Sequence, residues 1–154
     1  MKKEGQAPGS LCKIELIATD LVSTMPDEPN GILLGKMHLK AGAAWQEIYF
    51  TQDSAHFVEQ PNVVDGAEVY EMIVKWSVPK DNAVNLRYIL TESKKRHIAR
   101  LTKLNGGVLI AGKQDEGCRL MLDMRDAGKE ATDKDHYIVA LRLTRIKRVP
   151  HAAA

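Results

Sequence analysis

Two apolar runs joined by an Asn-Gly-Gly turn constrain the fold of this chain more than any other feature. Residues 96–104 precede the turn at Asn105-Gly106-Gly107, and residues 108–112 follow it. An Asn-Gly pair between apolar runs is the strongest short-range signal for a β-hairpin, because a type I′ turn needs a positive φ at both central residues. We therefore expect an antiparallel hairpin here, with positive φ angles at Asn105 and Gly106.

Residues 68–78 have the clearest strand pattern in the chain. Its bulky residues occupy every second position: Tyr70, Met72, Val74, Trp76 and Val78. Period-two spacing puts such residues on one face of a strand, so we expect this set in the core. Pro79 follows, and it ends the strand because proline cannot donate to a ladder.

Shorter patterns cover most of the remaining chain. Strands are predicted at residues 12–18, 32–39, 45–51, 56–60, 118–124 and 137–146, and loops at residues 23–31, 61–66 and 126–135. Residues 83–90 have a helical pattern, with Asp81 as a cap and an apolar stripe of Ala83, Leu86, Ile89 and Leu90. A strand is the alternative there, because residues 88–91 are β-prone.

These elements predict a β-rich α+β fold with about eight strands and one helix. The connections are short, which favours antiparallel pairing, because parallel strands need long crossovers. We expect an antiparallel sandwich or a small barrel, the arrangements by which small sheets protect their edges. The 154 residues suit one β-rich domain at 11–150, with a flexible arm at 1–10 and a tail at 151–154.

Composition excludes several classes of protein. The formal net charge is +2, which is too small to indicate nucleic-acid binding by the chain as a whole. No apolar stretch of a secretory signal stands at the N-terminus, and no run approaches the ~20 apolar residues of a membrane helix. Cys12 and Cys118 lie far apart and are interpreted as buried free thiols. We therefore expect a cytoplasmic protein, or one assembled there into something larger.

The chain contains no catalytic, cofactor-binding or metal-binding signature. The histidines are too scattered for a metal site: His38, His56, His97, His136 and His151. There is no Gly-x-Ser-x-Gly motif for a serine nucleophile and no glycine-rich phosphate loop. We therefore expect no enzymatic activity, no cofactor and no metal.

Two basic clusters are the candidate functional residues. The first contains Lys94, Lys95, Arg96, Arg100 and Lys103, and the second contains Arg142, Arg145, Lys147 and Arg148. In a strand, Arg96, Ile98 and Arg100 share one face, where they could contact phosphate groups. However, no aromatic stacking platform accompanies the charges, and edge strands also carry Lys and Arg to prevent aggregation. The clusters therefore face solvent, a neighbouring subunit or nucleic acid.

Residues 96–150 carry a longer pattern of strands and turns. A strand ending in Arg100-Leu101-Thr102 is followed by the Asn-Gly turn, a short strand ending at Gly112, a further strand, a polar loop and a Tyr137-x-Val139-x-Leu141 strand. Over this third of the chain the sequence resembles small structural proteins of tailed-phage and prophage tails and necks, particularly those of Bacteroidetes hosts. It departs from them at residues 113–117, which are more acidic and lack a proline.

The resemblance implies a virion or tail-assembly protein that works in a ring or tube with other virion proteins. We therefore expect a non-enzymatic, self-assembling structural subunit, such as a tail tube, neck or tail-completion protein, in the virion or in the host cytoplasm during assembly. Nucleic acid could pass near the basic strands. The alternative is a cytoplasmic β-barrel module that binds nucleic acid through those strands. A third, an enzyme with a site assembled from dispersed residues, has less support.

Overall fold

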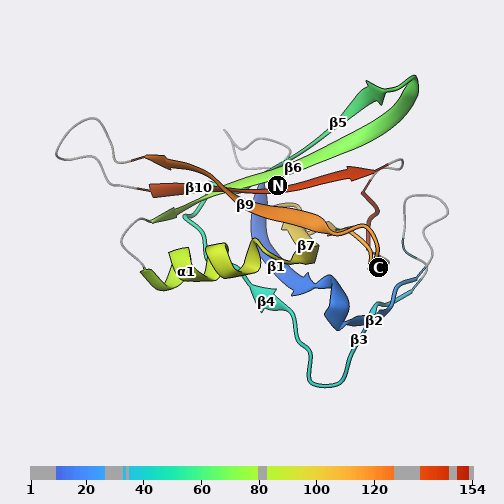
Figure 1. Cartoon of the computed structure of the whole chain (residues 1–154), viewed down its shortest axis with the longest axis horizontal. Coiled ribbons are helices and arrows are strands. Elements are labelled where there is room, and N and C mark those ends of the chain that lie inside the picture. The colour runs from blue at the N-terminus through green and yellow to red at the C-terminus, as the bar shows by residue number, and fades with distance from the viewer. Residues whose placement is uncertain are drawn as a thin grey trace.

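The protein is seen in a computed structural model that describes residues 10–26, 33, 35–79, 83–126, 136–145 and 149–152. In chain order its strands are β1 (Leu11–Ala18), β2 (Val22–Thr24), β3 (His38–Leu39), β4 (Gln46–Glu47), β5 (His56–Val64), β6 (Ala67–Pro79), β7 (Arg96–Lys103), β8 (Val108–Ala111), β9 (Cys118–Asp126) and β10 (His136–Arg145). A 3-10 helix, η1 (Thr19–Leu21), and an α-helix, α1 (Ala83–Glu92), complete the described elements (Figure 1).

The central feature is an antiparallel eight-stranded sheet with the order β4-β1-β7-β9-β10-β6-β5, in which β8 pairs with β7. The predicted β-rich antiparallel fold with one helix is therefore confirmed. The barrel alternative is wrong, because within the described residues β4 and β5 remain as separate edges. One isolated bridge, between Ser10 and His56, brings the start of β1 to the start of β5 without forming a ladder.

The main core lies on one face of this sheet. Met72, Val74, Trp76 and Val78 are buried, as the alternation on β6 predicts, whereas Tyr70 is only partly buried. Val74 pairs with Leu141 and Trp76 with Val139 across β6 and β10, so both strands present their apolar residues to the same side. A smaller apolar cluster on the opposite face joins β1, β7 and β8 to the two-stranded sheet of β2 and β3.

The predicted hairpin is confirmed as β7 and β8, but its turn differs from the expectation. Gly106 has a φ of 90°, whereas Asn105 keeps a negative φ. The Lys103 carbonyl accepts a hydrogen bond from the Gly106 amide at 3.0 Å, and the Lys103 amide donates to the Gly107 carbonyl at 2.8 Å. These bonds close a three-residue loop with one left-handed glycine instead of a two-residue type I′ turn. The Asn105 side chain accepts a hydrogen bond from the Gly107 amide, which stabilises this form.

A two-residue turn of the type I′ kind joins β5 to β6 instead. Val64 pairs with Ala67, and between them Asp65 and Gly66 both have positive φ angles, 51° and 81°. The predicted loop at residues 61–66 is therefore wrong over most of its length. Pro61 does not end β5, because β5 is an edge strand and an edge tolerates a residue without an N–H donor.

Other predicted elements are shorter or arranged differently. Of the predicted strands at 32–39 and 45–51, the described residues form only β3 and β4. The predicted helix is confirmed, but its buried stripe is not as expected: Ile89 is buried, whereas Leu90 is 50% exposed. Asp81 and residues 127–135 of the predicted polar loop lie outside the described residues.

Residues 149–152 lie along the outer edge of β8. The Ile110 amide donates to the Pro150 carbonyl at 3.0 Å, and the Ala152 amide donates to the Val108 carbonyl at 2.9 Å. This segment therefore supplies hydrogen-bond partners for a strand that would otherwise be an open edge. Among the described helices, none combines the length and the apolar character needed to cross a bilayer.

Candidate functional site: an arginine row across the sheet

Three neighbouring strands each place one arginine in the same line across the sheet. Arg96 on β7 is opposite Arg119 on β9, and Arg119 is opposite Arg142 on β10. Residues directly opposite each other share a face of the sheet and have Cβ atoms about 4.5–5.5 Å apart. We call Arg96, Arg119 and Arg142 the arginine row.

The arginine row lies on the face opposite the main core. The neighbours of Arg119 along β9, Cys118 and Leu120, are buried in that core, so Arg119 points to the other side. A hollow of about 610 Å³ lies over the row. It is lined by the arginine row and by Thr19, Gln114, Asp115, Glu116, Gly117, Met121, Leu143 and Thr144.

The loop before β9 fits against the row because residue 117 is a glycine. A Cβ atom added at Gly117 would lie 2.5 Å from the Arg96 Cβ and 2.8 Å from the Thr19 Cγ2, closer than such atoms can approach. Gln114 fixes the same loop from the other side, since its Nε2 donates to the carbonyls of Val22 and Ser23, both at 2.9 Å. The wall of the hollow is therefore attached to η1 and β2.

Some charged side chains that line the hollow have a partner of opposite charge, and others do not. The side chains of Arg96 and Arg119 make no ion pair or hydrogen bond with the residues that the structure describes. Glu116 lies with its Oε2 3.6 Å from the Nε of Arg145, a side chain that is itself only 3% exposed. Asp115 is the other acid that lines the hollow. Like charges placed directly opposite each other on a sheet repel, so the row has an electrostatic cost.

The first predicted basic cluster does not act as one surface. Arg96, Ile98 and Arg100 alternate along β7 and share a face, as expected. However, Arg100 is held by Glu15, to which its Nε and Nη2 donate at 2.9 and 2.7 Å. Its guanidinium also lies 4.6 Å from the ring centre of Trp45. Arg100 is therefore part of the packing on this face.

The remaining predicted residues lie apart from one another. Lys95 is exposed and 3.7 Å from Glu92, and Lys103 closes the β7–β8 loop through its backbone. Arg145 is buried beside Glu116. Lys147 and Arg148 lie outside the described residues.

The structure thus brings together Arg96 and Arg142 from the two predicted clusters and adds Arg119. Arg119 belongs to neither predicted cluster, because it stands alone in an apolar strand. Strand register is the signal that would reveal it.

The cysteines and histidines form no second site. Cys12 is exposed, so its predicted burial is wrong, whereas Cys118 is buried and its burial raises the thiol pKa to about 12. His97 is buried, with its Nε2 2.9 Å from the Glu92 Oε2. Among the described residues, no group of His, Cys, Asp and Glu could hold a metal ion.

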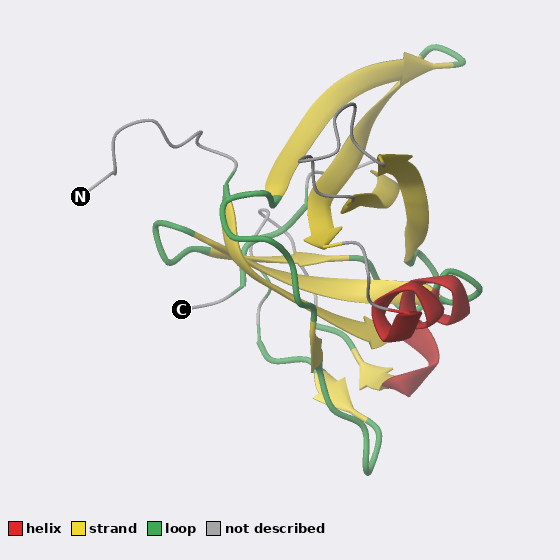
Figure 2. Ribbon diagram, turned by 90° about the vertical axis from the view of Figure 1, so that its left-hand side faces the viewer, coloured by secondary structure: helices red, strands yellow, loops and turns green. Residues whose placement is uncertain are grey.

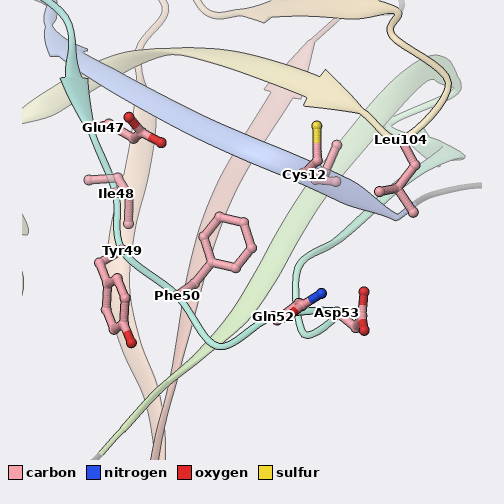
Figure 3. Close-up of a pocket in the computed structure, with 9 residues that line it drawn as sticks. Cys12, Glu47, Ile48, Tyr49, Phe50, Gln52, Asp53 and Leu104 are labelled. Carbon is pink, nitrogen blue, oxygen red and sulfur yellow. The ribbon is translucent and has the colours of Figure 1, made fainter.

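A second hollow, of about 560 Å³, lies beside β4. Figure 3 shows Glu47, Ile48, Tyr49 and Phe50 following one another along one side of it, with Cys12 and Leu104 across from them. We call it the β4 hollow; it is lined by Leu11, Cys12, Glu47, Ile48, Tyr49, Phe50, Gln52, Asp53 and Leu104. These residues include no histidine to activate the Cys12 thiol, so the lining lacks a nucleophile–base pair of the Cys–His kind.

Comparison with known proteins found no match to this chain among protein-family models, curated proteins or solved structures.

Proposed function

We propose that this protein is a non-enzymatic structural subunit that assembles with further copies of itself, in the manner of the tail and neck proteins that residues 96–150 resemble. The observation that carries the proposal is the end of the β5–β6 hairpin. Residues 60–68 are all exposed, and they include Val63 at 69% and Val64 at 47% exposure. We call residues 60–68 the hairpin arm.

The hairpin arm extends away from the rest of the sheet, as Figures 1 and 2 both show. Its strands remain paired to the tip, where Val64 is opposite Ala67, and Asn62 donates a side-chain hydrogen bond to Glu71 at 3.1 Å. A paired arm with apolar side chains and no core of its own is an unfavourable feature in an isolated subunit. A neighbouring subunit that covers the arm removes this cost.

Pro61 determines what kind of contact the arm can make. It interrupts the row of N–H donors along the outer edge of β5, so a continuous added strand would lose a hydrogen bond there. The contact is therefore carried mainly by the side chains of Val63 and Val64. Val63 and Val64 are neighbours on β5 and point to opposite faces of the arm, so a contact on one face buries one of them, and burying one valine contributes at most about 1.5–3 kcal/mol.

We assign the contact of the arm to the β4 hollow of the next subunit. Its lining combines apolar residues with Tyr49, which is 69% exposed, and Leu104, which is 43% exposed. An arm and a hollow are different surfaces, so their contact is head to tail, and repeated contacts of that kind close a ring or extend a tube. A protruding apolar arm and a partly apolar recess on one chain support the proposal of assembly.

Sedimentation or mass photometry at micromolar concentration, with and without moderate salt, tests the proposal. We expect multimers of the wild-type chain, and we expect the double variant Val63→Lys/Val64→Lys to be monomeric. Gln60→Lys is the matched control, because it adds a charge to the same arm without removing an apolar side chain. A wild-type chain that is monomeric under all conditions, with no partner that recruits it into a multimer, contradicts assembly.

The arginine row favours one alternative, a nucleic-acid-binding module. Such a module would be monomeric, and its affinity for nucleic acid would fall steeply as the salt concentration rises. The mass measurement therefore separates the two functions.

A further inference from the structure

We infer that the hollow over the arginine row is a binding site for a phosphate-bearing anion. The inference is independent of self-assembly, because the row lies on β7, β9 and β10, whereas the proposed contact involves the hairpin arm and the β4 hollow. It rests on the register that aligns Arg96, Arg119 and Arg142 on one face.

A comparison with Arg100 shows what the row lacks. Arg100 lies on the same strand and face as Arg96, and the nearly buried Glu15 receives two of its hydrogen bonds. Arg96 and Arg119 have no such carboxylate among the described residues. The arginine that takes part in packing is thus paired by the chain itself, while two in the row present their donors to the hollow.

The acids described near the row form no ion pair with Arg96 or Arg119. Glu116 lies against Arg145, which comes from the core side of β10. The other carboxylate that lines the hollow is Asp115. It is exposed and has no charged partner in the described part of the chain. Arg96 and Arg119 therefore lack a compensating carboxylate in the described part of the chain, and a bound anion would neutralise them.

Guanidinium groups match the oxygens of phosphate in particular. Each is planar, stays charged and donates in a fork that binds two oxygens at once. Thr19 and Thr144 also line the hollow, and a threonine hydroxyl can donate a further hydrogen bond. The volume of about 610 Å³ is typical of small-ligand sites, which span about 300–1,000 Å³.

The spacing of the row indicates a ligand with more than one phosphate group. Neighbouring strands lie about 4.8 Å apart, so the backbones that carry Arg96 and Arg142 are separated by roughly 10 Å. Long arginine side chains can converge on one phosphate, but a chain of linked phosphates lets each guanidinium bind its own pair of oxygens. Such a chain is present in an inorganic or nucleotide polyphosphate and in the backbone of a nucleic acid.

Calorimetric titration of the full chain with sodium tripolyphosphate tests the site, with a short single-stranded oligonucleotide as a second ligand. We expect Arg119→Gln to weaken binding about ten- to hundredfold, because it removes a charged hydrogen-bond donor from the middle of the row. Arg87→Gln is the control, since Arg87 is an exposed arginine on α1 and its loss changes the net charge equally. Tight binding of the oligonucleotide alone would assign the phosphates to nucleic acid.

Two further measurements exclude indirect effects. Arg119→Lys keeps the charge but loses the forked pair of donors, so we expect it to bind tripolyphosphate more weakly than the wild type. We expect its unfolding temperature to equal that of the wild type. The mass of the assembled particle should be the same for Arg119→Gln and for the wild type. Equal masses would show that the loss of anion binding does not come from a loss of assembly. The inference is overturned if the wild type binds neither ligand, or if Arg119→Gln and Arg87→Gln weaken binding equally.

Discussion

At the scale of single residues, Trp76 tests the core most directly. It is 2% exposed and packs in the main cluster on β6, and its Nε1 has no hydrogen-bond partner among the described residues. We expect Trp76→Ala to lower the free energy of unfolding by about 3–5 kcal/mol, measured by urea denaturation. Trp76→Phe should cost much less, because it keeps most of the ring. A Trp76→Ala protein that melts within a degree or two of the wild type would show that this face is not the core.

Glu15 gives the stability a defined dependence on pH. The hydrogen bonds from Arg100 hold the pKa of Glu15 below its ordinary value of 4.5, against the opposing effect of burial. A carboxyl with a lowered pKa stabilises the folded state above its unfolded pKa, and this stabilisation is lost as the pH falls through the folded pKa. We therefore expect the free energy of unfolding to fall more steeply below pH 4.5 in the wild type than in Glu15→Gln. Glu68→Gln is the control, because Glu68 is exposed. If the free energy of unfolding falls equally with pH in the wild type and in Glu15→Gln, the Glu15–Arg100 pair does not contribute to stability.

Single residues also show what sequence alone can predict. The burial of Trp76 follows from period-two spacing, because alternation and burial are both local to one strand. The environment of Arg119 depends on which strands lie beside β9, and no local pattern contains that information. The exposure of Cys12 is likewise set by the surroundings of β1 and not by the apolar character of a thiol.

At the scale of elements, the β7–β8 loop makes the next prediction. Gly106 has a φ of 90° and open space where a Cβ would lie, so a substitution there is strained by its backbone alone. We expect Gly106→Ala to destabilise the protein by about 1–2 kcal/mol, the cost of a left-handed conformation for an L-residue. Gly35→Ala, at a glycine without a positive φ, should be close to neutral. Equal denaturation midpoints for Gly106→Ala and the wild type would contradict the assigned loop geometry.

Elements were predictable where local chemistry decides them. The Asn-Gly pair predicts the place of the β7–β8 hairpin, but the type of turn depends on how many residues the strands leave unpaired. Pro61 predicts the end of a strand. At the edge of the sheet, however, a proline is tolerated, and β5 continues to Val64. Ile48 and Phe50 pack against the core beside β4 without joining a long strand, so apolar content alone overestimates strand length.

At the scale of the whole molecule, strand order creates the two surfaces that matter for function. The order of the sheet leaves β5 as an edge, and the same order aligns the arginine row. Neither consequence is contained in composition or periodicity, because both depend on pairings between distant segments. The antiparallel fold class was predictable, whereas its open edges and its charged face required the structure.

The central claim, that the hairpin arm of one subunit contacts the β4 hollow of the next, can be tested with the chain's own exposed thiol. Cys12 lines the β4 hollow, and Cys118 is buried. In Val64→Cys the new thiol lies at the far end of the nine-residue β5, roughly 26 Å from the start of that strand at about 3.3 Å per residue. The Ser10–His56 bridge keeps Cys12 near the start of β5, so the two thiols of one chain lie too far apart to form a disulfide.

Mild oxidation of Val64→Cys, followed by electrophoresis without reductant, is the measurement. We expect a ladder of disulfide-linked multimers that disappears in Val64→Cys/Cys12→Ser. The ladder should also be absent from Lys40→Cys, which places a thiol on an exposed residue elsewhere. A Val64→Cys chain that stays monomeric, or a ladder that persists without Cys12, would contradict the proposed contact.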